Sequence, residues 1–226
     1  VYQRRLLDTV APMAADRLAA MLHGFMMSPY DPWMKPYATG LGRQPSFQED
    51  AWFEQVTQEL HDYLLATRST FRTASQEALV GFVTYGTTSL FMGNTRATGQ
   101  TYYKHIPVRE CWIAEDEDGW VRTHFRRFTL TLSQAWKAYP NSAKLKEKAE
   151  RAKPDWNEEF TFLHCVLERT GEGVREAAHK LLKPFASVVI CETLSNEIVL
   201  EDGFDDFPFA VARFNKRSGE AYGRSP

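Results

Sequence analysis

Apolar residues recur at steps of three and four along the first third of the chain, which is the spacing of amphipathic helices. Pro12 lies early in the first stripe and either opens that helix or kinks it, because proline has no backbone N–H. Ser46 and Glu49 match a capping box and predict the start of the second helix. Three helices are therefore expected, over residues 6–25, 46–64 and 69–83.

The period of the apolar positions changes to two after about residue 88, which is typical of strands. Asp118-Gly119 is a strong hairpin turn between two of the predicted strands. Two short helices interrupt the strands, one near residues 132–139 with Ser133 as its candidate N-cap, and a charged one near residues 142–152. Extended segments are expected at residues 89–92, 100–104, 108–114, 120–132, 160–168, 185–192, 197–201 and 207–214.

Helices come first along the chain and hairpins follow, an order that predicts an α+β fold. We expect N-terminal helices packed on a mostly antiparallel sheet that is built from hairpins. The helical part is assigned to residues 1–87 and the hairpin-rich α+β part to residues 88–226. The two parts are expected to form one continuous domain.

The composition excludes several classes of protein. With 43% hydrophobic and 13% aromatic residues among 226, the chain can form a core and is not disordered overall. A formal charge of −2 argues against a dedicated, tight nucleic-acid binder, which usually carries a clear basic excess. No apolar run is long enough to span a bilayer. Cys111, Cys165 and Cys191 are far apart and odd in number, so we expect reduced thiols in a cytosolic protein.

Charge is distributed unevenly behind this near-zero total. Residues 122–153 hold nine Lys and Arg against two Glu, whereas residues 154–206 hold twelve Asp and Glu against four Lys and Arg. Such segments are most often solvated faces of a protein. The other interpretation is a contact between subunits, in which a basic face meets an acidic face of the neighbour.

The motifs of common enzymes are absent from the sequence. There is no Gly-x-x-x-x-Gly-Lys-Ser/Thr loop to hold a nucleoside triphosphate and no Gly-x-Ser-x-Gly nucleophile elbow. The acidic run at residues 115–118 resembles a calcium loop, but Ala114 and Phe125 would stand at positions that need oxygen ligands. A turn is the better interpretation of this run.

Two histidine pairs are candidates for chemistry, and neither predicts a site. His164-Cys165 could bind a metal, but no Cys-x-x-Cys or His-x-x-x-His accompanies it, so a buried strand pair is favoured. His61-Asp62 lies on the second predicted helix, where adjacent side chains do not face each other, so a solvated polar face is favoured. The sequence therefore assigns no catalytic, cofactor-binding or metal-binding residue, and an enzyme is not expected.

The C-terminal segment carries two further motifs, Pro208-Phe209-x-Val211-x-Arg213 and Gly219-Glu220-x-Tyr222-Gly223-Arg224-Ser225-Pro226. They resemble the head-to-tail connector (portal) proteins of short-tailed bacteriophages, which carry Pro-Phe-x-Val-x-Arg and Gly-Glu-x-Tyr-Gly-Arg-Gly-Pro. Ser225 stands where that family usually has glycine. The residues that match the family's motifs, for which a structural role is implied, are Pro208, Phe209, Arg213, Tyr222, Gly223, Arg224 and Pro226.

Upstream segments resemble the same family in the same order, so the resemblance covers nearly the whole chain. Met34 departs from it, because an aromatic residue is common there. The matching segments are Asp8 to Ala19, Ser28-Pro29 followed by Trp33, Tyr85-Gly86-Thr87-Thr88-Ser89-Leu90, Glu115 to Gly119, Arg126-Arg127-Phe128, and Thr131 with Gln134-Ala135.

The resemblance implies a structural protein of the virion, made in the bacterial host cytoplasm and assembled at the portal vertex of the capsid. It implies a homo-oligomeric ring, typically a dodecamer, that meets capsid protein, the packaging terminase and tail proteins. Double-stranded DNA would pass through the channel without tight binding, and neither a cofactor nor a membrane is implied. Since chains of the family continue past the Tyr-Gly-Arg motif, this chain is expected to be the N-terminal portion, without the tunnel and distal regions.

Within such a ring, Arg126 and Arg127 are the candidate residues for a contact between subunits. The missing phosphate loop agrees with a passive ring whose ATPase is a separate protein. The near-neutral charge agrees with a channel in which DNA slides, because each neutralised phosphate would add affinity. Two alternatives stay open: a stand-alone cytosolic enzyme, such as a hydrolase of unknown substrate, and a monomeric phage adaptor. Ring formation separates the portal hypothesis from both.

Overall fold

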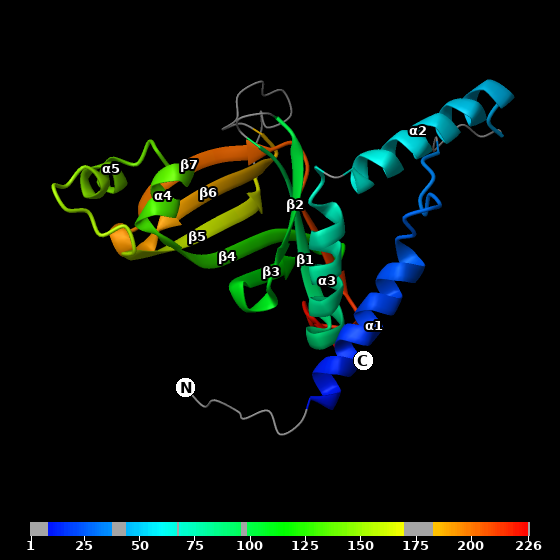
Figure 1. The fold of residues 1–226 in the computed structure, drawn as a ribbon, viewed down its shortest axis with the longest axis horizontal. Coiled ribbons are helices and arrows are strands. Elements are labelled where there is room, and N and C mark those ends of the chain that lie inside the picture. The colour runs from blue at the N-terminus through cyan, green and yellow to red at the C-terminus, as the bar shows by residue number, and fades with distance from the viewer. Residues whose placement is uncertain (1–8, 38–43, 67, 96–98, 170–182, 226) are drawn as a thin grey trace. The chain divides into compact units, whose positions relative to one another are not determined.

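The computed structural model describes residues 9–37, 44–66, 68–95, 99–169 and 183–225 (Figure 1). Long helices come first and antiparallel sheets follow, so the predicted α+β class is confirmed. Among the described residues, no helix is both long and apolar enough to cross a membrane. The helices are α1 Val10–Met26, α2 Phe47–Leu65, α3 Phe71–Tyr85, α4 Leu132–Ala138 and α5 Ala143–Ala149, with short 3-10 turns at Val108–Glu110 and Glu192–Leu194.

The strands form three sheets, with three, two and five members among the described residues. The strands are β1 Thr87–Asn94, β2 Thr101–Ile106, β3 Cys111–Glu115, β4 Val121–Thr131, β5 Glu159–Glu168, β6 Phe185–Cys191, β7 Glu197–Phe204, β8 Phe209–Arg213, β9 Asn215–Lys216 and β10 Gly223–Arg224.

The chain divides into two compact units, which are described separately. Unit 1 comprises Val1–Ile106, Ala210–Ser218 and Tyr222–Pro226, and unit 2 comprises Pro107–Phe209 and Gly219–Ala221. The chain changes from helix to strand at Thr87, and β1 and β2 belong to the same unit as the three long helices.

Unit 1 is built around α3. Its core joins small side chains of α1 to larger ones of α3, with Ala19 packed against Leu79 and Val83. The helix prediction for α1 is confirmed, and Pro12 opens the helix because it lies in the first turn, where the missing N–H costs nothing. Leu6 and Leu7, which the predicted stripe included, lie outside the described residues.

The start of α2 confirms the capping box. The Ser46 hydroxyl accepts from the Glu49 amide at 3.4 Å, and the Glu49 carboxylate accepts from the Ser46 amide at 2.7 Å. These two bonds satisfy backbone donors that a helix N-terminus otherwise leaves open.

The other side of α3 packs on β1 and β2, which belong to a three-stranded sheet in the order β2-β1-β8. β1 and β2 are antiparallel, with Ser89 opposite Ile106. Gly81 permits the close approach of α3 to β2, because a Cβ at this position would lie 3.0 Å from Nε2 of His105. The expected packing of a helix on an antiparallel sheet is therefore present in unit 1.

Unit 2 contains the five-stranded sheet β3-β4-β5-β6-β7, in which every neighbouring pair is antiparallel. The predicted hairpin turn between β3 and β4 is confirmed, since the amide of Gly119 donates to the carbonyl of Asp116 at 2.9 Å and Gly119 has φ of 77°. The predicted extended segments at residues 185–192 and 197–201 also form an antiparallel hairpin, as β6 and β7. One strand starts late: residues 108–110 form a 3-10 turn, and β3 begins only at Cys111.

The core of unit 2 lies where α4 and α5 cover one face of this sheet. The prediction that Ser133 is the N-cap of α4 is wrong. Thr131 is the N-cap, because its hydroxyl accepts from the Gln134 amide and the two residues form a capping box. β4 continues to Thr131 through pairing with Glu159, so the helix begins directly at the strand end. The buried core residues are Leu132, Ala135, Leu145, Phe160, Phe162, Val189, Cys191, Leu194 and Val199.

Candidate assembly site

The Tyr-Gly-Arg motif at the C-terminus docks on the turn between α3 and β1, within unit 1. The amide of Phe214 donates to the carbonyl of Gly86 at 2.8 Å. The Thr87 hydroxyl accepts from the Gly223 amide at 2.8 Å and donates to the Gly223 carbonyl at 3.3 Å. Thr87 and Gly223 are both buried, so these bonds replace contacts with water that the groups have lost.

Glycine is required at both contact points. Gly86 ends α3 in the left-handed region, with φ of 73°, and a Cβ there would lie 2.0 Å from the backbone carbon of Arg224. A Cβ on Gly223 would lie 2.5 Å from the Gly86 carbonyl oxygen. The segment from Tyr85 to Leu90 and the Gly223-Arg224 end of the C-terminal motif therefore meet in one structural contact within unit 1. Pro226 lies outside the described residues.

The Pro-Phe motif serves a different purpose, in unit 2. Pro208 and Phe209 are buried. The Phe209 ring stacks on the imidazole of His124 with 3.8 Å between centroids and 7° between planes. Burial lowers the pKa of His124 to about 3, with smaller effects from His164 and Arg126. The motif therefore covers an uncharged histidine in the sheet.

His164, part of the His164-Cys165 pair for which the sequence favoured a buried strand pair over a metal site, lies beside this stack. Its Nε2 is 2.9 Å from the Ser187 hydroxyl, and burial followed by the charge of Arg126 lowers its pKa to about 4. Cys165 is the next residue on β5, so its side chain points to the opposite face of the sheet. No group of three or more metal-ligating side chains occurs in the described parts of the chain.

The cysteines are free thiols, as expected for a reduced protein. Cys111 and Cys191 are buried and Cys165 is partly buried. Burial raises the pKa of Cys111 to about 11, so this thiol is protonated near neutral pH and is a poor nucleophile.

The sequence predicted that His61-Asp62 forms a solvated polar face, and this prediction is wrong for His61. His61 is buried, and its Nε2 lies 3.1 Å from the carbonyl oxygen of Ser28. Asp62 is exposed, with its carboxylate 3.8 Å from Nδ1 of His61. The histidine connects α2 to the loop after α1, which is a structural role.

Arg126 and Arg127, the candidate subunit contacts, differ in accessibility. The guanidinium of Arg126 donates twice to one carboxylate oxygen of Glu110, at 2.9 and 3.2 Å, and covers the Phe128 ring. Arg126 is 15% exposed, whereas Arg127 is 56% exposed and donates to Glu192 at 2.9 Å. Arg127 is therefore the better placed of the two to meet another molecule.

The basic and acidic segments of unit 2 pair with one another inside the chain. Neither sequence interpretation, solvated faces or subunit contacts, included this arrangement. Several of these charges are therefore already paired within one subunit. This weakens the hypothesis that the basic and acidic segments alone form a contact between subunits. Among the residues that the structure describes in these segments, four ion pairs join residues 122–153 to residues 154–206: Arg122–Glu168, Arg127–Glu192, Lys144–Glu197 and Lys148–Glu158.

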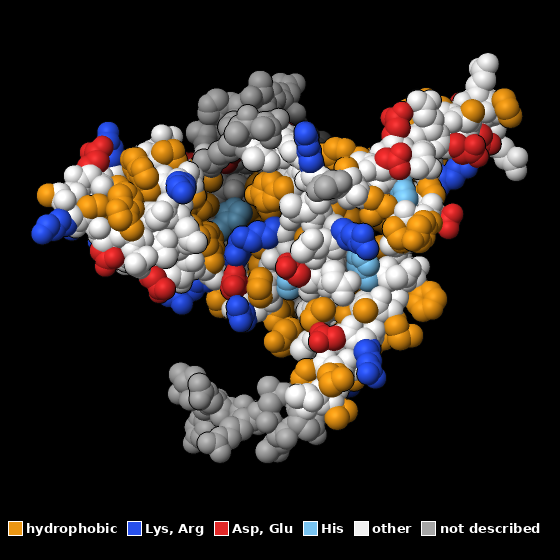
Figure 2. Space-filling view, viewed as in Figure 1, with side chains coloured by type: hydrophobic (Ala, Val, Ile, Leu, Met, Phe, Trp, Pro, Cys, Tyr) orange, Lys and Arg blue, Asp and Glu red, His pale blue; other side chains and the backbone are white. Residues whose placement is uncertain are grey.

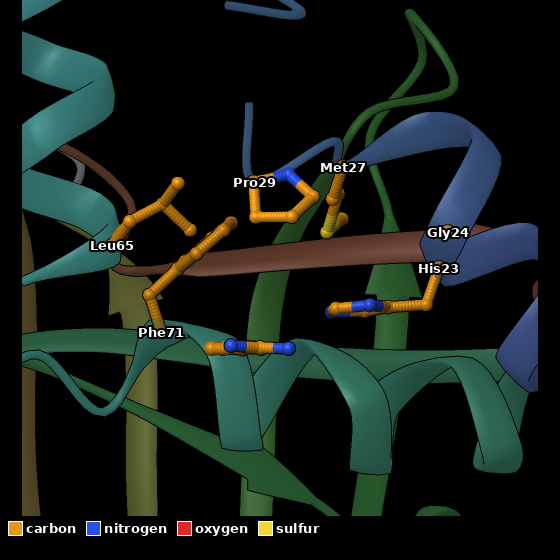
Figure 3. Close-up of a pocket in the computed structure, with 7 residues that line it drawn as sticks. His23, Gly24, Met27, Pro29, Leu65 and Phe71 are labelled. Carbon is orange, nitrogen blue, oxygen red and sulfur yellow. The ribbon is translucent and has the colours of Figure 1, made fainter. Parts of the chain in front are cut away.

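A hollow of about 230 Å³ lies between α1, α2 and α3 (Figure 3). His23 is its main polar group, and Nε2 of this ring is 3.2 Å from the Ser75 hydroxyl. Burial and the charge of Arg72 lower the pKa of His23. Ser75 is buried, and its hydroxyl also donates to the carbonyl of Arg72 at 3.0 Å, so the contact with His23 ties α1 to α3. The lining residues are His23, Gly24, Met27, Pro29, Leu65, Phe71 and Arg72.

Large apolar side chains are exposed along α1 and α2, where Figure 2 shows orange groups at the surface. Exposed apolar areas of this extent usually mark contacts between proteins. The spacing of apolar residues predicted one apolar stripe on each of these helices. The exposed members are Val10, Met13, Leu18, Met21, Phe25 and Met26 on α1, and Phe47, Trp52, Leu60 and Tyr63 on α2.

In the described residues, two motif segments are hydrogen-bonded to each other, and apolar side chains are exposed where another protein could bind. Both features are typical of a structural subunit. A family model described as bacteriophage head to tail connecting protein matches residues 2–226, and the chain belongs to this family. The suspected resemblance is confirmed. No curated protein matches the chain.

Membership makes the chain a structural phage protein and a virion component that interacts with other parts of the head and tail. Sequence reasoning found the motif residues but missed their partners, above all Thr87 and His124. Thr87 lies in a segment already matched to the family, which was the available signal for it. His124 had no such signal, because its role depends on the ring that covers it.

Proposed function

We propose that this chain is a subunit of a portal ring, the head-tail connector through which double-stranded DNA is packaged and ejected. The observation that carries the proposal is the family match over residues 2–226. It is supported by the Tyr-Gly-Arg segment, whose contacts explain two of the matched motifs together. In this role the subunit is not an enzyme, and the energy for packaging comes from a separate terminase.

Two physical features agree with a ring. A closed ring needs a heterologous contact, in which one surface of each subunit meets a different surface of its neighbour. α1 and α2 present two different exposed apolar faces. The formal charge of −2 agrees with a channel that does not hold DNA tightly, since every neutralised phosphate would add salt-dependent affinity.

Capsid protein, terminase and tail proteins are the proposed partners, and the capsid vertex is the proposed location. Before assembly the subunit resides in the bacterial cytoplasm. Arg127 is proposed to lie at a subunit boundary, because its guanidinium is more than half exposed. Arg126 would support that boundary from inside the subunit through Glu110.

Native mass spectrometry and electron microscopy of the full-length protein test this function. We expect a closed ring, typically of twelve subunits, that requires no nucleotide. The protein alone should hydrolyse no ATP. A monodisperse monomer at high concentration, both with and without capsid and tail proteins, would contradict the ring and favour a monomeric adaptor.

A further inference from the structure

The helix α1 is apolar on two opposite sides. Ala15, Ala19 and Leu22 face α3 in the core of unit 1. On the helical wheel, Met13, Met21 and Phe25 project to the other side, and Phe25 is 83% exposed. A helix that is apolar all round is normally buried all round. The outer face of α1 therefore has the character of a surface that another element covers.

The helix α2 has an apolar stripe with the same property. Trp52, Val56, Leu60 and Tyr63 follow one another at steps of four, four and three, so they share one side of the helix. Trp52 is 58% exposed, and the buried residues of α2 are Thr57 and His61, on a different side. Isolated helices are marginal in water, so a helix of this kind gains stability when its stripe is covered.

The two faces match in length and area. With 17 and 19 residues, α1 and α2 are about 26 and 28 Å long. On the two faces themselves, the exposed fractions of Met13, Met21 and Phe25 and of Trp52, Leu60 and Tyr63 correspond to an apolar area on the order of 700 Å². A standard interface buries about 1,600 Å², of which about 900 Å² is apolar, so these faces supply most of the apolar area of one contact.

Charge favours the same pairing. α2 contains five acidic residues and no Lys or Arg, and Glu59 borders its apolar stripe. The outer face of α1 contains a single cation, the exposed Arg17. Glu59 at the edge of the α2 stripe and Arg17 within the outer face of α1 attract each other, which favours one register of the two helices. Two α2 stripes would bring like charges together, so their pairing is disfavoured.

We propose that the Trp52–Tyr63 stripe of α2 packs along the outer face of α1 of a second copy of this chain. This inference rests on the proposed ring, and it names the two surfaces that meet at each junction. Because the surfaces differ, every copy donates one and receives one, so the contact repeats until the ring closes.

Two separate substitutions in the full-length protein, each of which adds one negative charge, test this contact. Trp52→Glu places a carboxylate in the α2 stripe, and Met21→Glu places one in the outer face of α1. Each should weaken self-association at least tenfold, because an unpaired charge would be buried. Ala51→Glu is the matched control: it adds the same charge one residue away, on the polar side of α2, and should leave rings intact.

Mixing the two variants gives the sharper result. The intact α2 of the Met21→Glu protein can meet the intact α1 of the Trp52→Glu protein, and no further junction can form. Native mass spectrometry should therefore detect heterodimers in the mixture and monomers in each variant alone.

Other outcomes overturn the inference in recognisable ways. If wild-type protein forms rings and both variants do so equally well, the junction lies elsewhere and only this inference fails. If the variants assemble normally but melt at lower temperature, the stripe of α2 covers α1 of its own chain. If wild-type protein never assembles, the proposed ring fails, and this contact fails with it.

Discussion

The backbones of Gly86 and Gly223 are in contact, although Gly86 directly follows α3 and Gly223 lies in β10, far along the chain. A Cβ on Gly223 would lie 2.5 Å from the Gly86 carbonyl oxygen, and one on Gly86 would lie 2.0 Å from the Arg224 backbone. Backbone atoms cannot move aside as a flexible side chain can. The contact therefore constrains both residues to glycine.

The first prediction is that Gly86→Ala and Gly223→Ala each lower the free energy of unfolding by about 2 kcal/mol or more, because the methyl group overlaps fixed backbone. Gly219→Ala is the control. Gly219 also has positive φ, of 80°, but nothing lies within 4 Å of its Cβ position, so only the backbone strain of about 1 kcal/mol applies. Urea denaturation measures all three, and equal losses would contradict the contact.

The second prediction concerns the hydroxyl of Thr87. Thr87→Val keeps the shape of the side chain but removes the acceptor for the Gly223 amide, so it should cost about 1–3 kcal/mol. Thr87→Ser keeps the hydroxyl and should lose clearly less. Thermal unfolding of the two variants tests this order. If Thr87→Val is as stable as the wild type, the bond does not hold the C-terminal segment.

The third prediction is a loss of stability at mildly acid pH. The ordinary histidine pKa is 6.5, whereas folding lowers that of His124 to about 3 and that of His164 to about 4. The unfolded chain therefore binds more protons below pH 6.5, and unfolding becomes easier as pH falls from about 6.5 toward 4. Above pH 6.5 both forms are neutral and these histidines add no pH dependence.

The slope of this loss is up to about 1.4 kcal/mol per pH unit for each histidine. Replacing one histidine by a residue that does not titrate in this range, as in His124→Gln, should lower both the stability and the slope. Denaturation curves at a series of pH values provide the measurement. An unchanged slope in His124→Gln would show that this imidazole titrates normally in the folded protein.

The fourth prediction separates stability from assembly at the two arginines. Arg126→Glu should destabilise the monomer by about 1–3 kcal/mol, because it sets two carboxylates together at a largely buried site beside Glu110. Arg127→Glu changes an exposed side chain, so the melting temperature should hardly move. If Arg127 lies at a subunit boundary, rings of this variant should become scarcer and more sensitive to salt. Rings with wild-type yield and salt response would place Arg127 outside the boundary.

The sequence by itself determined the local structure of this protein. The three long helices, the capping box at Ser46 and the hairpin at Gly119 all depend on residues within one or two turns of each other, so their patterns are visible in the chain. The N-cap of α4 was assigned to Ser133 instead of Thr131, because strand pairing with Glu159 decides where β4 ends. The motif residues were recognisable only through resemblance.

Tertiary structure alone decided which distant residues meet. Thr87 and Gly223 are 136 positions apart, and no local pattern connects them. The same holds for His124 under Phe209 and for the basic segment that pairs with the acidic one. Tertiary structure also decided which apolar side chains of each helix are buried and which are exposed. Periodicity shows that α1 and α2 have apolar faces, but burial depends on the surfaces that surround them, and those form only when the whole chain has folded.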